Sequence, residues 1–438
     1  MNDFVNQEAL RAEKLSEQTN ISFFWTGRAG TGKTSLINKI KRNNKKCYIT
    51  VATTGIAAIQ ANAETVHSLF GIQIGFQDYN LNRYFRLSDE KKNIIRRCNT
   101  IIVDESSMLR CDLLDAMDKR LKQVCRNNKL FGGKQVVLCG DLSQLPAIIT
   151  KDEKELFIRN YGDSCKGYFF EAKCLKENYF PVVNLKHIYR QTDQVYIDIL
   201  ERLRNDTITQ NDIDLLNSRV VKDIPNDAIV LTPTNLGAEF INDNKFNDLQ
   251  SKQYIYHGII RGDIKTNDIP ISNPLKLKEG CRIMFVRNDN NEIKRFVNGS
   301  LGYVSFLGNN EIHVNVDNRE SVVNVERFEW EKMRYIINEK NELKLNIIGT
   351  YTNFPLKLAW ATTIHKSQGL TFDKMVIDLS KGNMFANGQL YVALSRLRSL
   401  ECLYLTTPIS WKDIHVDNKV LNYVKENELK EDIIDFLC

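Results

Sequence analysis

The residues with the clearest chemistry form the octapeptide GRAGTGKT at positions 27–34. It follows a short apolar run and precedes a helical pattern, the setting in which backbone N–H groups ring a phosphate at a helix N-terminus. The Lys33 ammonium would then contact the β- and γ-phosphates, and the Thr34 hydroxyl would ligate Mg²⁺. The pattern predicts a P-loop that binds ATP and Mg²⁺; the alternative is a simple glycine-rich turn. The predicted nucleotide-binding residues of this loop are Gly27, Ala29, Gly30, Thr31, Gly32, Lys33 and Thr34.

Two carboxylates and a glutamine end the apolar runs that follow. Asp104 and Glu105 close the run TIIVDE, and Gln144 stands in GDLSQLP, after the run QVVLC. Because parallel strands end at the sheet edge where the P-loop opens, these side chains are expected to meet the nucleotide. Asp104 would hold Mg²⁺ through its water shell, Glu105 would act as base for the attacking water, and Gln144 would sense the γ-phosphate. An Asp-Glu pair alone is more often a helix cap, so it is the upstream P-loop that favours catalysis.

Composition sets the limits within which these residues must work. A chain of 438 residues with 42% hydrophobic and 26% charged residues is typical of a globular protein with about two to four structural units. No run approaches the roughly 20 apolar residues of a membrane span, and the N-terminus lacks a signal-peptide pattern. The ten cysteines form no CxxC pair, so reduced thiols are expected, and the net charge of +6 tolerates a polyanion without identifying one. The abundance of Asn, Lys and Ile favours a bacterial or phage source and a cytoplasmic location.

Strand-like apolar runs occur in two sets, which predicts an α/β protein with two parallel sheets. The runs lie at 21–26, 45–53, 99–105 and 135–141, and then at 228–234, 374–380 and 402–408. Between Pro274 and Thr350, alternating runs with Asn-Gly and Gly-Asn turns predict a small all-β insertion. Residues 72–97 are irregular and are predicted to form a loop-rich excursion.

The remaining motifs are recognisable by their order. They read VATTGIAAIQANAETVHSLFGI, DESSM, GDLSQLPAI, LKHIYRQTD, LTPTN, FPLKLAWATTIHKSQGLTFD and GQLYVALSRLRS. This series resembles the helicases of superfamily 1B, and DKRLKQVCRNNKLFGGKQVVLCGD resembles the signature segment of the petite-integration-frequency (PIF) type. Leu130, Ala147 and Asn353 depart from the usual PIF pattern. These departures weaken the distinction between a PIF-type and a RecD-type helicase more than they weaken the assignment as a helicase.

The resemblance implies an architecture. The expected fold is α/β, with two RecA-like P-loop NTPase domains, a small insertion in the first and a small Src-homology-like β-barrel in the second. The first domain would span residues 1–180 with a wedge-like insertion at 72–97. The second would combine 181–255 with 351–438, and the barrel would occupy 256–350.

The resemblance also implies site residues beyond the P-loop. Arg190 and Arg396 would reach the γ-phosphate from the second domain, since guanidinium neutralises the charge of the transition state. Gly369 would also contact the nucleotide, and Gln7 is the candidate reader of adenine. The expected DNA-backbone contacts are Thr54, Gly55, His67 and Ser68 in the first domain, and Thr234, Asn235, Thr363, His365 and Lys366 in the second. For each arginine the alternative is a surface salt bridge, and for each histidine a buried structural role.

The implied activity is ATP-dependent unwinding of DNA with 5′ to 3′ movement on a single strand. Forked duplexes, G-quadruplexes and RNA–DNA hybrids are the substrates that such enzymes unwind, and the motor is expected to be monomeric. Phe76, Tyr84 or Phe85 could stack on bases or form a strand-separating wedge, although most aromatic residues of such a segment simply form its core. The alternatives are a RecD-like exonuclease subunit, a translocase that does not unwind, and an ATP-gated DNA-binding switch.

Overall fold

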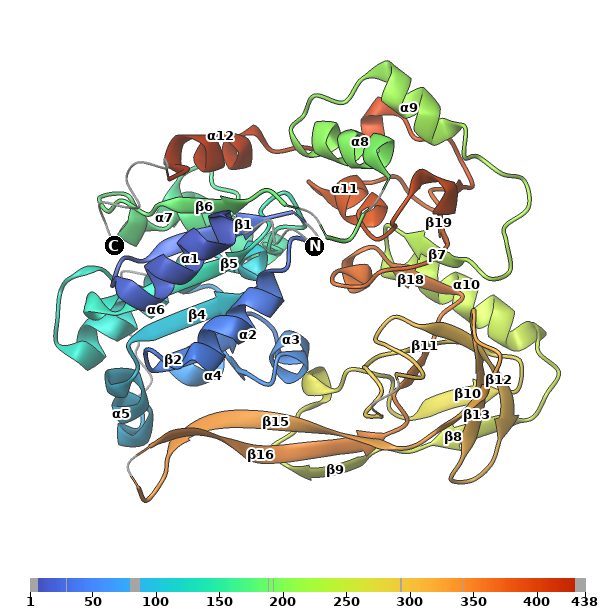
Figure 1. The fold of residues 1–438 in the computed structure, drawn as a ribbon, viewed down its shortest axis with the longest axis horizontal. Helices are drawn as coiled ribbons and strands as arrows, with labels where there is room; N and C mark the ends of the chain where they lie inside the picture. Colours follow the sequence, from blue (N-terminus) through green and yellow to red (C-terminus); the bar gives the residue numbers. More distant parts are fainter. Residues whose placement is uncertain are drawn as a thin grey trace. The chain divides into compact units, whose positions relative to one another are not determined.

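The computed structural model describes residues 7–28, 30–78, 87–187, 189–191, 193–291, 294–340 and 342–429 (Figure 1). The chain divides into two compact units, which are described separately. Unit 1 comprises Met1–Arg190, Lys332–Ile348 and Asp417–Cys438, and unit 2 comprises Gln191–Glu331 and Gly349–Val416. Among the described residues, no helix combines the length and the apolar character that a membrane crossing requires.

Unit 1 is built on a six-stranded parallel sheet in the order β3-β2-β4-β5-β1-β6. Its strands are β1 (Phe23–Gly27), β2 (Tyr48–Ala52), β3 (Glu64–Thr65), β4 (Thr100–Asp104), β5 (Gln135–Gly140) and β6 (Val182–Leu185). Its helices are α1 (Gln7–Gln18), α2 (Lys33–Asn43), α3 (Gly55–Gln60), α4 (Val66–Phe70), α5 (Asp89–Arg97), α6 (Cys111–Cys125), α7 (Lys151–Tyr161) and α12 (Asn418–Asn427).

Apolar residues on both faces explain why the sheet of unit 1 is covered on both sides. In β1, Phe23 and Trp25 pack with α1 and α2, whereas Phe24 packs into the core formed with α4, α5 and α6. Successive strand residues point to opposite faces, so a continuous apolar run supplies two cores at once. Each fully buried large side chain stabilises the fold by roughly 1.5–3 kcal/mol.

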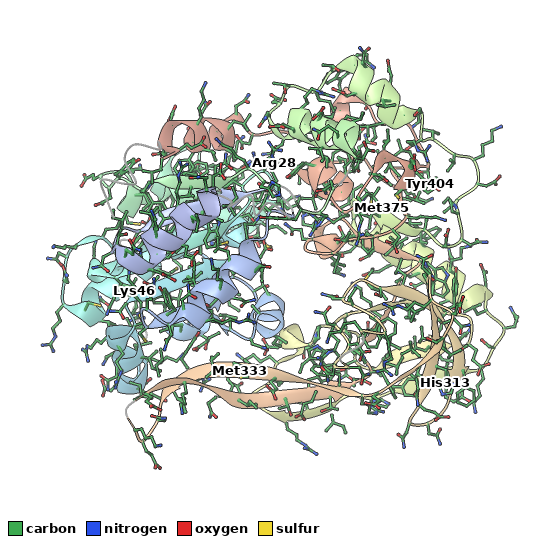
Figure 2. The ribbon with its side chains drawn as sticks, in the orientation of Figure 1. Arg28, Lys46, His313, Met333, Met375 and Tyr404 are labelled. Carbon is green, nitrogen blue, oxygen red and sulfur yellow. The ribbon has the colours of Figure 1, made fainter. Side chains whose placement is uncertain are left out.

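Unit 2 contains a four-stranded parallel sheet in the order β18-β7-β19-β20. Its strands are β7 (Ile229–Thr232), β18 (Ala361–Thr363), β19 (Met375–Ile377) and β20 (Leu403–Leu405), and its helices are α8 (Gln194–Arg204), α9 (Gln210–Asn217), α10 (Asn235–Asp248) and α11 (Gln389–Leu394). Met375 and Tyr404 mark the adjacent strands β19 and β20 in Figure 2.

Antiparallel strands are inserted between β7 and β18. A five-stranded sheet has the order β14-β13-β12-β11-β17, and smaller sheets pair β10 with β8 and join β15, β16 and β9. The strands are β8 (Gln253–Tyr256), β9 (Ile259–Gly262), β10 (Leu275–Lys278), β11 (Arg282–Phe285), β12 (Leu301–Leu307), β13 (Ile312–Val316), β14 (Val322–Val325), β15 (Phe328–Ile337), β16 (Leu343–Asn353) and β17 (Leu356–Leu358). The predicted strands of the all-β insertion are confirmed, and they enclose a core of their own.

The division of the chain differs from the predicted boundaries in three segments. Unit 1 continues past residue 180 to Arg190, because β6 pairs with β1 and extends the sheet of unit 1. Residues 417–429 also belong to unit 1, where the Leu429 N–H donates to Val182 O at 2.8 Å. Residues 332–348, predicted to belong to the barrel, are the outer part of the β15–β16 hairpin and pack on unit 1. Figure 2 shows Met333 in this part of β15.

The excursion at 72–97 is more ordered than predicted. Its second part forms α5, whose Ile94 and Ile95 are buried in the core of unit 1. Ser88 caps this helix by accepting the Lys91 N–H at 3.3 Å, a cap that replaces a missing helical hydrogen bond. Residues 79–86 lie outside the described part of the chain, and with them the candidate wedge residues Tyr84 and Phe85.

Candidate active site

The P-loop connects the end of β1 to the start of α2, as the motif predicts. Gly30 and Gly32 have φ angles of 87° and 81°, which favour glycine, and Lys33 is the first residue of the helix. The Lys33 Nζ donates to Gly27 O at 2.6 Å and to Arg28 O at 3.0 Å, so its ammonium lies over the loop's own backbone. Figure 2 labels Arg28, which follows β1 directly.

The other loop residues are placed around this turn. The Thr31 hydroxyl donates to Arg28 O at 2.9 Å, and Thr34 is exposed in the first turn of α2. A Cβ on Gly27 would lie 2.6 Å from Thr31 Oγ1, so a larger residue cannot enter there without movement. Ala29, also predicted to bind nucleotide, lies outside the described residues.

Asp104 and Glu105 end β4 at the same sheet edge. Glu105 is exposed and has a φ of 50°, which is uncommon for a residue other than glycine. Its backbone N–H donates to Asp104 Oδ1 at 2.9 Å. Burial raises the pKa of Asp104, opposed by this hydrogen bond and by the charge of Lys33. Burial raises the pKa of the Cys139 thiol on β5. The charges of Asp104 and Glu105 raise this pKa further, whereas the charge of Lys33 lowers it. Because β1 and β4 flank β5 in the parallel sheet, Lys33, Asp104 and Glu105 lie at the same end of that sheet.

Gln144 lies in the loop after β5 and is 8% exposed. Its Nε2 donates to Asp141 Oδ2 at 3.2 Å, and its backbone N–H donates to Asp141 O at 3.0 Å. A Cβ on Gly140 would lie 3.0 Å from Ser106 Oγ, which shows how closely the end of β5 approaches the segment after Glu105. The Gln144 loop and the Glu105 segment thus pack against one another.

A magnesium ion fits the donors that these elements present. The exposed Thr34 hydroxyl and the Asp104 carboxylate are hard oxygen ligands, and Mg²⁺ normally completes its shell with phosphate oxygens and water. The described residues contain no cluster of three or more His, Cys, Asp or Glu side chains that could hold a metal ion. The donor set therefore suits an ion that arrives with a nucleotide.

The two predicted arginines lie in different units. Arg190 is the last residue of the first segment of unit 1, where a Cβ on Gly30 would lie 2.4 Å from Arg190 Cβ. Arg396 does belong to unit 2, but it is only 1% exposed. Its Nε donates to Val392 O at 2.9 Å and one terminal nitrogen donates to Leu370 O at 3.3 Å, beside the exposed Gly369. Gln7 is exposed at the start of α1.

In unit 1, the predicted nucleic-acid contacts follow β2 and β3. Thr54 and Gly55 open α3, where Thr54 Oγ1 accepts the Ala57 N–H at 3.2 Å. His67 and Ser68 lie on α4, and the Ser68 hydroxyl donates to Glu64 Oε1 at 2.6 Å. Burial lowers the pKa of His67, assisted by the Arg110 guanidinium, which favours the neutral ring at pH 7.

In unit 2, the corresponding residues follow β7 and β18. Thr234 and Asn235 open α10, and Thr234 Oγ1 accepts the Gly237 N–H at 3.2 Å. Thr363 is 3% exposed, and its Oγ1 accepts the Lys366 N–H at 3.2 Å. β7 and β18 are parallel neighbours, and the Ile364 N–H bonds Thr232 O at 3.0 Å, so His365 and Lys366 follow the same sheet edge as Thr234.

The aromatic candidate Phe76 has a structural role. Its ring is partly buried against the core, and its centroid lies 5.0 Å from that of Phe157 in an edge-to-face arrangement. Two further residues, Glu64 and the exposed Phe385, were not predicted from the sequence, although Glu64 lies within one of the quoted motifs. Glu64 is 2% exposed, and its Oε2 also accepts the Tyr335 N–H at 3.2 Å, so the hairpin helps to fix the acceptor of Ser68.

A helix N-terminus, a lysine and two carboxylates at one parallel-sheet edge define a P-loop nucleotide-binding protein. Residues 6–212 match the profile of the PIF1-like helicase family. The ATP-dependent DNA helicase Pif1 of Bdellovibrio bacteriovorus is 33% identical over 436 residues, covering 96% of this chain and 92% of that protein. The chain belongs to the PIF1-like helicase family.

Solved structures extend the similarity to the fold. A crystal structure of Bacteroides sp Pif1 in complex with ADP-AlF4 has a TM-score of 0.86 and 36% sequence identity, and covers 96% of both chains. Bacteroides Pif1 bound to single-stranded DNA has a TM-score of 0.68 at 36% identity, again covering 96% of both chains. A further structure with the same scores concerns unwinding of forked duplex DNA by two coordinating Pif1 helicases.

Proposed function

We propose that this chain is an ATP-dependent DNA helicase that moves 5′ to 3′ along a single strand and unwinds forked duplexes. The placement of Lys33, Asp104 and Glu105 at one edge of the sheet in unit 1, after the parallel strands β1 and β4 that flank β5, carries the proposal. The family membership and the nucleotide-bound and DNA-bound relatives support it. The parallel sheets of the two units support the assignment of two RecA-like domains, with the antiparallel strands as a Src-homology-like barrel.

The side chains divide the hydrolysis reaction among them. Lys33 leaves the carbonyls of Gly27 and Arg28 and binds the β- and γ-phosphates, where its charge stabilises the transition state. Glu105, exposed at the end of β4, takes the proton of the attacking water, and Gln144 orients that water. Thr34 and Asp104 would hold Mg²⁺, which neutralises charge on the phosphate oxygens when bound. Arg190, Arg396, Gly369 and Gln7 complete the proposed nucleotide site.

The strand is held mainly through its phosphates. Hydroxyls, backbone N–H groups and one lysine make contacts that do not depend on base sequence, which suits a motor that must pass over any sequence. The proposed contacts are Thr54, Gly55, His67, Ser68, Thr234, Asn235, Thr363, His365 and Lys366. Whether one chain suffices stays a prediction, and the forked-DNA relative described as two coordinating helicases makes it worth measuring.

The test combines hydrolysis and unwinding. ATP hydrolysis is measured with and without single-stranded DNA for the wild type, for Glu105→Gln and for Glu155→Gln, an exposed control on α7. We expect strong stimulation by DNA, a loss of roughly 10²–10⁴-fold in Glu105→Gln and no loss in the control. Duplexes with a 5′ or a 3′ tail then test direction, and unwinding from the 5′ tail alone is expected.

Other results would select the rival functions. Stimulated hydrolysis without unwinding of either duplex would favour a translocase or a subunit that needs partner chains. Binding of DNA that responds to ATP without turnover would favour a switch. Hydrolysis that is indifferent to DNA would overturn the nucleic-acid assignment.

A further inference from the structure

Phe385 is a large apolar side chain that is 63% exposed in unit 2. It lies in the connection that follows β19, and β19 is a parallel neighbour of β7. The loops after β7, β18 and β19 therefore leave the same edge of one sheet, and the first two carry the proposed phosphate contacts. An exposed phenyl ring at this edge is a candidate for contact with a ligand.

The backbone around Phe385 is fixed at several points. The side-chain oxygen of Gln389, a residue 1% exposed, accepts the N–H groups of Phe385 at 3.0 Å and Ala386 at 3.2 Å. The Gln389 Nε2 in turn donates to Pro233 O at 3.1 Å, which ties the loop to the residue before Thr234. His415 Nε2 lies 3.1 Å from Met384 O on the other side. The ring is thus presented on an anchored loop, which reduces the entropy lost when a ligand binds.

One ring neighbour of Phe385 is itself a proposed nucleic-acid contact. The His365 and Phe385 centroids are 6.5 Å apart and the planes are inclined by 22°, a near-parallel arrangement. Burial lowers the pKa of His365, which favours an uncharged imidazole at pH 7. Two uncharged rings in near-parallel planes present π-faces of the kind on which a nucleobase stacks.

The charge nearby favours a polyanion. Burial and, as the smaller cause, the charge of the neighbouring Lys366 together lower the pKa of Lys357 to about 8. In the described part of the chain, neither lysine side chain has a hydrogen bond or ion pair to a carboxylate. The Lys381 ammonium lies 5.1 Å from the centroid of the Phe240 ring, adding a cation on the same connection as Phe385. Ammonium groups of Lys366 and Lys381 on the loops that carry His365 and Phe385 suit phosphates joined to bases.

We propose that Phe385, with His365 beside it, is a stacking platform for a base of the bound single strand. This inference rests on the proposed function and gives it a base contact in addition to the phosphate contacts. Stacking does not select a sequence, because every base presents a π-face. The platform therefore adds affinity for unpaired bases, whose faces are accessible, over a duplex, whose faces are already stacked.

The test compares two strands that differ only in their bases. Binding of a fluorescent thymidine oligonucleotide and of an abasic strand with the same number of phosphates is measured by anisotropy. Phe385→Ala should weaken binding of the thymidine strand about tenfold and leave the abasic strand unchanged. Phe385→Trp should retain affinity, whereas Phe385→Leu, which keeps apolar volume without a π-system, should resemble the alanine variant.

A matched control is available in unit 1. Tyr179 is 62% exposed, and it precedes β6, so it lies at the sheet edge opposite the P-loop. Tyr179→Ala should bind both strands as the wild type does. An equal loss for the two strands in Phe385→Ala, or no loss for either, would overturn the platform while DNA-stimulated hydrolysis by the wild type still supported the helicase. A wild type that binds neither strand would instead refute the proposed function itself.

Discussion

The two units start a helix after a parallel strand in the same way, yet only one of them carries a P-loop. Thr54 after β2 has φ −125° and ψ 156°, and Thr234 after β7 has φ −122° and ψ 154°. Each hydroxyl accepts the N–H three residues later at 3.2 Å. Unit 1 adds Lys33, Asp104 and Glu105 at its sheet edge. The comparison indicates that both units use the same backbone cap to present residues proposed to contact the strand, whereas the P-loop and the two carboxylates belong to unit 1.

The largest expected effect on ATP turnover comes from removing Lys33, which belongs to the P-loop of unit 1. Lys33→Ala should lower ATP turnover by about 10³-fold, because the variant lacks the ammonium group that would bind the phosphates. In the structure this group donates to the carbonyls of Gly27 and Arg28. Steady-state hydrolysis at saturating DNA measures it, and Lys39→Ala, an exposed lysine on α2, is the control. Equal turnover in the two variants would mean that the P-loop does not position the reacting phosphates.

The second prediction asks whether unit 2 takes part in the chemistry through Arg396. Arg396→Lys keeps the charge but loses the planar fork, and it should reduce turnover by roughly 10²-fold if the guanidinium reaches the phosphates during hydrolysis. The variant should also unfold more readily, because Val392 O and Leu370 O each lose a donor. Turnover and thermal unfolding are measured together, with the exposed Arg398→Lys as control. Lower stability with unchanged turnover of the folded enzyme would assign Arg396 to structure alone.

The sequence predicts those elements whose structure is determined by their own residues rather than by contacts with distant residues. The seven apolar runs became β1, β2, β4, β5, β7, β19 and β20, because a buried strand is specified by its own residues. The turn from β1 into α2 was likewise predictable, since GRAGTGKT contains the residues that this backbone requires. In the two parallel sheets the strands missed are β3, β6 and β18, which have two to four residues each and are defined by their neighbours in the sheet rather than by their own pattern.

The remaining differences depend on contacts between distant parts of the sequence. The Tyr335 hydroxyl accepts the N–H of Thr50, 285 residues away, and no local pattern indicates such a pair. Arg396 could be recognised by its motif, but its burial depends on the carbonyls that surround it. Phe385 escaped notice because one aromatic residue in a loop has no periodicity, and its exposure is known only from the fold.

The third prediction sharpens the comparison with one buried tyrosine from each unit. Tyr335→Phe should destabilise β2 by about 1–3 kcal/mol, since the buried Thr50 N–H loses its acceptor. Tyr351→Phe in unit 2 should cost less, because the Asn353 amide that donates to this hydroxyl also donates to Tyr256 O. Hydrogen exchange of peptides that cover β2 and β16 measures both effects. Equal effects would show that the two hydroxyls are equivalent despite their different partners.

The smallest expected effect tests the shared cap itself. Thr54→Ala and Thr234→Ala each remove a hydroxyl that accepts a helix N–H, which costs about 1 kcal/mol and should accelerate exchange in the first turn of α3 and α10 about fivefold. Serine at either position keeps the acceptor and should retain protection, so the alanine–serine difference isolates the hydrogen bond. Because the two caps have dihedral angles within 3° of each other and hydrogen bonds of the same length, the alanine–serine difference in exchange should be similar for α3 and α10. Disagreement would mean that the surroundings of the helix, rather than its cap, stabilise one of the two starts, and the likeness between the units would then be limited to the backbone.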